Sequence, residues 1–170
     1  MSTREIGGTA ARRPAWIDLL LAVVPVVVVS LAGSALTVPE IAGWYAGLAK
    51  PSFNPPNWLF GPVWTLLFAL MALAAFRVWR LPAGAPGRGE ALLAYHVQLV
   101  LNLSWSAAFF AANSPAAGLA VIAVLIAAIL WTISAFLRAG ARLSAALFLP
   151  YLAWVAFAAV LNGTIWWLNS

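Results

Sequence analysis

The segment WIDLLLAVVPVVVVSLAGSAL, at residues 16–36, decides the fold of this chain. Its only charged residue, Asp18, lies near its start, and apolar or small side chains fill the rest. A helix crosses the hydrocarbon core of a bilayer with about 20 mostly apolar residues. The segment therefore predicts a transmembrane helix, in which Pro25 is tolerated because neighbouring helices satisfy the carbonyl group that it frees.

The same segment also resembles a secretory signal peptide. Arg12 and Arg13 precede the apolar run, and Ser30-Leu31-Ala32 resembles a cleavage site. The run is nevertheless long, contains a proline and is followed by more apolar stretches, which favours an uncleaved helix. We therefore expect this segment to stay in the protein as its first span.

Four further stretches are long and apolar enough to cross a bilayer. With the first, they cover residues 16–36, 58–79, 91–112, 117–137 and 143–168. Segments rich in proline, glycine or arginine separate them, and sustained period-two alternation, the pattern of a transmembrane β-barrel, does not occur. The sequence predicts an all-α membrane protein. We expect a five-transmembrane-helix bundle over residues 16–170 after a basic tail at residues 1–15.

Composition excludes several classes of protein. Of the 170 residues, 65% are hydrophobic and 8% are charged, whereas a soluble domain carries about 25% charged residues. The pI of about 10.8 is high, but the basic residues form no run or face that would bind nucleic acid. With no cysteine, one histidine and four carboxylates, we expect no metal site, no cofactor and no hydrolytic triad.

The cations predict the orientation in the membrane. With five spans, the N-terminal tail and the second and fourth loops lie on one side. That side holds eight of the nine cations: Arg4, Arg12, Arg13, Arg77, Arg80, Arg88, Arg138 and Arg142. Lys50 alone lies on the other side. The positive-inside rule then places the N-terminus in the cytoplasm and the C-terminus outside.

Three tryptophans lie inside the spans rather than at their ends. Trp64 and Trp105 are about 9–10 Å from the outer ends of their helices, at 1.5 Å per residue, and Trp154 lies near the middle of the last span. We expect all three to face one outward-opening cavity beneath the long first loop, residues 37–57. The rigid prolines of that loop suit a lid over the mouth of the bundle.

Two stripes at helical spacing support this cavity. They consist of Gln98, Asn102, Trp105 and Phe109 on the third span and Tyr151, Trp154, Ala158 and Asn162 on the fifth. The amides should face the bundle interior, because an unpaired amide in hydrocarbon is costly. Two readings stay open: the stripes line a binding site, or the amides join helices while the tryptophans fill the core. Likewise, Lys50 either contacts an anionic group of a ligand or reaches lipid phosphates.

Longer motifs carry a resemblance to a known family. They are WYAGLAKPSFNPPNW at residues 44–58, GPVW at 61–64, LNLSW at 101–105, PYLAW at 150–154 and LN at 161–162. In this order the motifs closely resemble the TspO/translocator protein family, also called tryptophan-rich sensory proteins or peripheral benzodiazepine receptors. The resemblance covers about residues 40–165.

The resemblance implies a ligand-binding membrane protein, commonly dimeric, with its pocket under the first loop. Members bind porphyrins such as protoporphyrin IX, sterol-like molecules and benzodiazepine-type drugs. Carried over by position, the pocket residues are Tyr45, Trp64, Asn102, Trp105, Trp154 and Ala158, to which we add Lys50 for an acidic group. We therefore predict a homodimeric membrane receptor, sensory or regulatory, that binds a tetrapyrrole.

Two other functions remain as alternatives. In some members, tryptophans that match Trp64 and Trp154 are implicated in light- and oxygen-dependent degradation of protoporphyrin, so these two are the catalytic candidates if the protein is an enzyme. A porphyrin or sterol transporter is a weaker alternative, since transporters usually show internal repeats and intramembrane charges. Phe53 and Phe68 stand where many members have Trp and Tyr, and the C-terminal cholesterol motif is missing.

Overall fold

A computed structural model describes residues 13–170, so most of the predicted basic tail lies outside the described residues. The long helices are α1 (Ala15–Ile41), α3 (Asn57–Trp79), α4 (Arg88–Ser106) continued by the π-helical turn η1 (Ala107–Ala111), α5 (Pro115–Arg138) and α6 (Arg142–Leu147) followed by α7 (Leu149–Leu168). A short helix, α2 (Trp44–Gly47), lies between α1 and α3. Within residues 13–170, five helical segments are long and apolar enough to cross a membrane. The prediction of an all-α, five-span membrane protein is confirmed.

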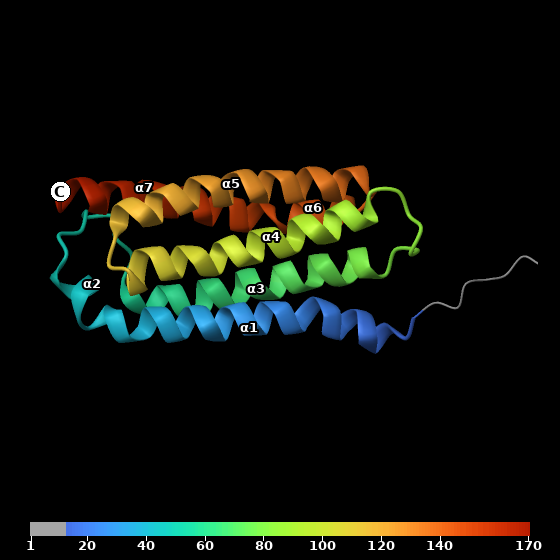
Figure 1. Cartoon of the computed structure of the whole chain (residues 1–170), viewed down its shortest axis with the longest axis horizontal. Coiled ribbons are helices and arrows are strands. Elements are labelled where there is room, and N and C mark those ends of the chain that lie inside the picture. The colour runs from blue at the N-terminus through green and yellow to red at the C-terminus, as the bar shows by residue number, and fades with distance from the viewer. Residues whose placement is uncertain (1–12) are drawn as a thin grey trace, which may run out of the picture.

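The spans lie side by side in one elongated bundle (Figure 1). The connection that contains α2 lies at the same end as the C-terminus, and the α3–α4 loop lies at the opposite end with the start of α1. We call residues 42–56 the lid, and the two ends of the bundle the lid end and the arginine end. The arginine end carries Arg13, Arg77, Arg80, Arg88, Arg138 and Arg142.

The predicted start of the first loop at residue 37 is wrong. Helix α1 continues to Ile41 and contains Pro39 as well as Pro25. A proline removes one backbone donor, and in the last turn of a helix that loss affects a single bond. The lid is therefore shorter than the sequence predicted, and the last turns of α1 stand beside it.

The fifth span is interrupted near its start. Helix α6 ends at Leu147 and α7 begins at Leu149. Pro150 has no N–H with which to continue the ladder of hydrogen bonds, and the Phe148 N–H bonds instead to the nearer Ala145 carbonyl at 3.1 Å. The chain nevertheless crosses as one span, because Leu152 donates to the Phe148 carbonyl at 2.9 Å.

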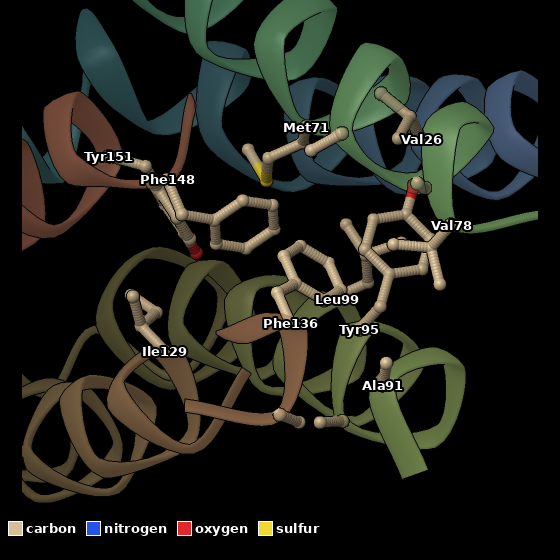
Figure 2. Packing of buried hydrophobic residues seen from close by; sticks show 14 of the residues in the cluster. Val26, Met71, Val78, Ala91, Tyr95, Leu99, Ile129, Phe136, Phe148 and Tyr151 are labelled. Carbon is tan, nitrogen blue, oxygen red and sulfur yellow. The ribbon is translucent and has the colours of Figure 1, made fainter. Parts of the chain in front are cut away.

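Small side chains let the helices pack closely in the arginine half. Six of the described alanines there are completely buried: Ala22, Ala74, Ala75, Ala91, Ala94 and Ala135. Two buried hydroxyls join the helices across this core, Tyr95 to the Ala22 carbonyl at 3.0 Å and Ser144 to the Ala74 carbonyl at 3.0 Å. Figure 2 shows larger side chains, among them Met71, Phe136 and Phe148, filling the space between the helices. This half holds the bundle together.

Candidate functional site

The lid half of the bundle encloses a cavity of about 490 Å³. Its walls come from α1, α2, α3, α4, η1 and α7. Six residues named from the sequence line it: Tyr45, Trp64, Asn102, Trp105, Trp154 and Ala158. The three tryptophans within the spans thus face one cavity beneath the lid, as their positions predicted. Their role in binding a ligand stays a prediction.

Aromatic contacts hold the indole rings of the wall in position. The Trp64 ring lies 5.3 Å from the Phe68 ring and 6.2 Å from the Tyr151 ring, measured between centroids. The Trp154 ring meets Phe60 edge-on at 5.8 Å. Such edge-to-face contacts between rings are favourable beyond the area that they bury. The cavity is therefore walled by aromatic surfaces whose orientation is fixed before any ligand arrives.

A π-helical turn shapes the wall where α4 ends. At Ala107–Ala111 the ladder widens, and the Ala112 N–H bonds to the Ala107 carbonyl at 2.8 Å, five residues back. The extra residue in the turn lets two consecutive rings, Phe109 and Phe110, both be buried against the lid. π-turns of this kind occur often at functional sites. Here the turn brings Phe109 into a stack with Trp105, with 5.5 Å between ring centroids.

The buried amides join helices and also line the cavity. Asn102 on α4 donates to the Tyr151 hydroxyl on α7 at 2.9 Å. Asn162 on α7 accepts from the Trp105 indole at 3.2 Å and donates to the Pro115 carbonyl at 2.7 Å. Both asparagines are also wall residues, so the same amides join helices and line the cavity, and binding of a ligand there stays a prediction.

Gln98 behaves differently from the two asparagines. It is completely buried, as its place in the stripe predicted, but it lies in the packed core and not on the cavity wall. Its amide nitrogen donates to the Tyr95 carbonyl at 3.0 Å on the same helix. The inner limit of the cavity on α4 is therefore Asn102, one turn further along the helix.

Hydrogen bonds stabilise the lid from within and tie it to the residue that follows α7. Within the lid, the Tyr45 hydroxyl donates to the Asn54 side-chain oxygen at 2.9 Å. Asn169, after the end of α7, bonds to both the backbone N–H and the carbonyl of Ala49 at 2.9 Å each. Burial raises the pKa of Tyr45 above its ordinary value, partly opposed by the bond to Asn54. At neutral pH the hydroxyl is therefore protonated and acts as the donor.

Lys50 is the one sequence-predicted site residue that the structure places outside the cavity wall. Its ammonium group donates to the Leu48 carbonyl at 3.0 Å and lies 4.5 Å from the centre of the Tyr45 ring. These contacts stabilise the lid from within. No charged residue is among the described residues that line the cavity.

Sequence reasoning missed the wall that α1 contributes. Ser30, Ser34 and Thr37 line the cavity from α1, and Thr65 on α3 and Ser106 on α4 add two more hydroxyls to the wall. Their spacing along α1 is four and then three residues, which is the signal of a shared helix face. This shared face was overlooked because Ser30-Leu31-Ala32 resembles a cleavage site and because Thr37 was assigned to the first loop.

The described residues therefore form an integral, multi-pass membrane protein with an aromatic, uncharged cavity under a tied lid.

Similar sequences identify the family of this chain. A sequence model of the TspO/MBR family matches residues 21–168. The chain is 40% identical to the tryptophan-rich protein TspO of Archaeoglobus fulgidus, over 91% of this chain and 98% of the relative. It is 42% identical to a tryptophan-rich sensory protein of Cereibacter sphaeroides, over 70% and 72%. It is also 37% identical to the human translocator protein, over 79% of each chain. The chain belongs to the TspO/MBR family.

Proposed function

We propose that this protein is a membrane receptor for a tetrapyrrole such as protoporphyrin IX, with a sensory or regulatory role. The observation that carries the proposal is the convergence of Tyr45, Trp64, Trp105 and Trp154 on one cavity. Its volume of about 490 Å³ lies within the usual range for small-molecule sites, roughly 300–1,000 Å³. Flat aromatic walls suit a flat macrocycle. A relative that is named a sensory protein supports the sensory part.

The polar groups of the site suit the edge of a tetrapyrrole. Asn102 and the hydroxyls of Ser34, Thr37 and Thr65 offer hydrogen bonds from the wall. Lys50 remains our candidate partner for a propionate. If it turns toward a ligand at the mouth of the cavity, its ammonium group gives up its bonds to the Ala46 and Leu48 carbonyls. Sterol-like and benzodiazepine-type molecules are expected to compete for the same apolar wall.

Fluorescence titration of the purified protein with protoporphyrin IX tests the receptor. We expect Trp105→Leu and Trp154→Leu each to weaken binding by roughly tenfold, because each removes a large contact surface worth more than 1 kcal/mol. Trp16→Leu is the matched control, since Trp16 is 62% exposed at the arginine end. Equal effects of all three substitutions would show partitioning into detergent instead of binding in the cavity.

The enzyme alternative rests on a separate observation: Trp64 and Trp154 both line the cavity. An indole there can donate an electron to a photoexcited porphyrin, with dioxygen as the final oxidant. Phenylalanine keeps a ring in place but removes the easily oxidised indole. We expect Trp64→Phe and Trp154→Phe to keep most of the porphyrin affinity and to lose any light-driven bleaching above that of free porphyrin. If the wild-type protein bleaches porphyrin no faster than detergent alone, the enzyme hypothesis is ruled out and the receptor hypothesis stands.

We also propose that the arginine end faces the cytoplasm, with the N-terminus, and that the C-terminus lies outside. The support is that six arginines of the described residues lie at that end, which the positive-inside rule assigns to the cytoplasm. Fusions at residue 170 provide the measurement. Alkaline phosphatase activity there agrees with the proposal, and a fluorescent cytoplasmic reporter there contradicts it.

The homodimer stays a proposal as well, with the third span as its interface. Small residues permit close approach of helices in lipid, and Ala111 and Ala112 at the end of that span are exposed. Helix α5 presents a second set of exposed small residues, Ala120, Ala123 and Ala127. Cysteine cross-linking in membranes at Ala112 and at Ala123 compares the two faces. Capture of monomer alone at both positions would contradict the dimer.

A further inference from the structure

Arginines gather around one tryptophan at the arginine end, far from the cavity. The guanidinium carbon of Arg88 lies 5.0 Å from the centre of the Trp79 ring, and that of Arg13 lies 6.0 Å from it. Arg80, the next residue after α3, bonds to the Arg13 carbonyl at 3.2 Å and to the Asp18 carboxylate at 3.1 Å. We call Arg13, Trp79, Arg80 and Arg88 the arginine cluster.

The cluster has more positive than negative charge. Asp18 is the only carboxylate bonded to it within residues 13–170, and this carboxylate pairs with Arg80. Arg13 and Arg88 have no carboxylate partner among the described residues, since Glu90 pairs with Arg138. Two positive charges therefore remain uncompensated within 11.0 Å of one another, given their distances from the shared ring. Like charges at this separation repel and favour an anion between them.

Backbone carbonyls hold Arg80 and Arg88 in place, and Arg13 lies over the Trp79 ring. One terminal nitrogen of Arg88 donates to the Trp79 carbonyl at 3.1 Å. Its Nε is buried and has no partner among the described residues, which leaves part of its donor capacity unused. Arginine binds phosphate with several donors of one rigid fork. The cluster thus provides guanidinium groups suited to a phosphate.

An apolar groove begins beside the cluster. It runs between α1 and α3, has a volume of about 520 Å³, and extends from Leu19 and Phe76 to Leu31 and Thr65. From Leu19 to Leu31 it follows α1 for about 18 Å, at 1.5 Å per residue, which is close to the length of an extended lipid acyl chain. Trp16, exposed at the start of α1, marks the depth of the headgroup layer. The groove therefore lies where acyl chains lie.

From these two features together we propose that the arginine cluster and the α1–α3 groove form a binding site for an anionic phospholipid. The phosphate lies between Arg13 and Arg88, and one acyl chain lies in the groove. A free phosphate ion would use the cluster alone, whereas a phospholipid uses both parts. The groove meets the proposed tetrapyrrole cavity at Ser30, Thr65 and Phe68, whereas the arginine cluster lies at the other end of the groove, and neither proposal depends on the other.

Native mass spectrometry of the purified full-length protein in detergent tests the site with dioleoyl phosphatidylglycerol as the probe and dioleoyl phosphatidylcholine as the neutral lipid. We expect phosphatidylglycerol to bind more tightly by roughly tenfold, because it carries a net negative charge, whereas the ammonium group of phosphatidylcholine offsets its phosphate and is repelled by the arginines. Arg13→Gln with Arg88→Gln should abolish that preference. The matched control is Arg77→Gln with Arg142→Gln, which removes two exposed arginines from the same end and should leave the preference intact.

Two further variants separate the parts of the site. Arg13→Gln alone should not impair folding, because the Arg13 side chain makes no hydrogen bond with the described residues. It should still weaken the binding of phosphatidylglycerol. Ala72→Phe fills part of the groove without changing the charge of the protein, and it should weaken the binding of both lipids. Equal loss in the control pair, no preference for phosphatidylglycerol, unchanged binding in Ala72→Phe, or displacement of the lipid by inorganic phosphate would each overturn the proposal.

Discussion

The two halves of this bundle solve the same packing problem in opposite ways. In the arginine half, completely buried alanines on α1, α3 and α4 bring the helices together, and the Tyr95 hydroxyl reaches the backbone of α1. In the lid half, Trp64, Trp105 and Trp154 are only partly buried, because they face a cavity of about 490 Å³. A hollow half can exist because the other half is tightly packed.

The difference follows from which side chains face one another. Lipid surrounds the helices, so association depends on close packing more than on hydrophobic burial. In the arginine half, buried alanines and large aromatic rings belong to one packed core. In the lid half, the large rings of α3, α4 and α7 face Ser30, Gly33 and Ser34 of α1, which are too small to fill the space between them. Substitutions in the two halves test how far this contrast extends.

The largest effect is expected from truncating a ring in the packed half. Phe136 is completely buried and meets Phe148 edge-on at 5.2 Å. Phe136→Ala should lower the free energy of unfolding by about 3–5 kcal/mol, since the cavity that it leaves cannot collapse. Phe60→Ala is the counterpart in the hollow half, where truncation only enlarges an existing cavity, and it should cost less than about 2 kcal/mol. Reversible unfolding in detergent measures both, and equal losses would contradict the contrast.

One part of the lid half, around Gly118, is tightly packed. A Cβ at Gly118 on α5 would lie 2.8 Å from the Asn162 side-chain oxygen and 2.9 Å from the Phe109 ring. Gly118→Ala should therefore cost about 1–3 kcal/mol of stability. It should also weaken porphyrin binding, because Asn162 holds the Trp105 indole.

Gly163→Ala is the matched control for Gly118→Ala. A Cβ at Gly163 would meet only the flexible end of Leu119, at 3.8 Å. In a helix, alanine is more favourable than glycine by up to about 1 kcal/mol, so this variant should be as stable as the wild type or slightly more stable. A loss comparable to that of Gly118→Ala would mean that the close approach at Gly118 is not the cause.

The sequence alone predicted most of the fold but only part of the cavity. Long apolar runs and their breaks set the five spans, and helical spacing brought Asn102 and Trp105 to one face. Lengths along a helix also placed Trp64 and Trp105 at about the same depth and Trp154 near the middle of its span. These features depend on local geometry, which a sequence carries directly.

Contacts between distant segments were beyond the reach of the sequence. Contacts inside the lid could not be predicted either: the position of Lys50 depends on a carbonyl group of the lid, and no rule of residue spacing predicts such a contact. The contribution of α1 was missed because Ser30 and Ser34 are small and common residues in transmembrane helices. The bonds of Asn169 to Ala49 join residues 120 positions apart, and only the folded chain brings them together.

The tie between the lid and the bundle should have a moderate effect. Asn169→Ala removes the two bonds to Ala49 and one to the Ile165 carbonyl at 2.7 Å. Each such bond contributes about 1 kcal/mol or less when water can replace it. We expect faster hydrogen exchange in residues 42–56 with little change in global stability. Ser170→Ala, which loses only a bond to the Trp167 carbonyl, serves as the control and should exchange like the wild type.

The smallest effect concerns the protonation of Tyr45. Burial raises the pKa of its hydroxyl in the closed lid, above the ordinary tyrosine value of about 10. Below that value the hydroxyl is protonated in the closed and open lid alike, so the closed state keeps its full stability. As the pH rises from about 10 through the raised pKa, the open lid loses the proton first, and closure becomes less favourable. Tyrosinate absorbance of the wild type minus that of Tyr45→Phe isolates this titration, and its midpoint should lie above 10. Asn169→Ala, which loosens the lid, should move the midpoint back toward 10. A midpoint at or below 10 in the wild type would mean that the lid does not bury Tyr45 in solution.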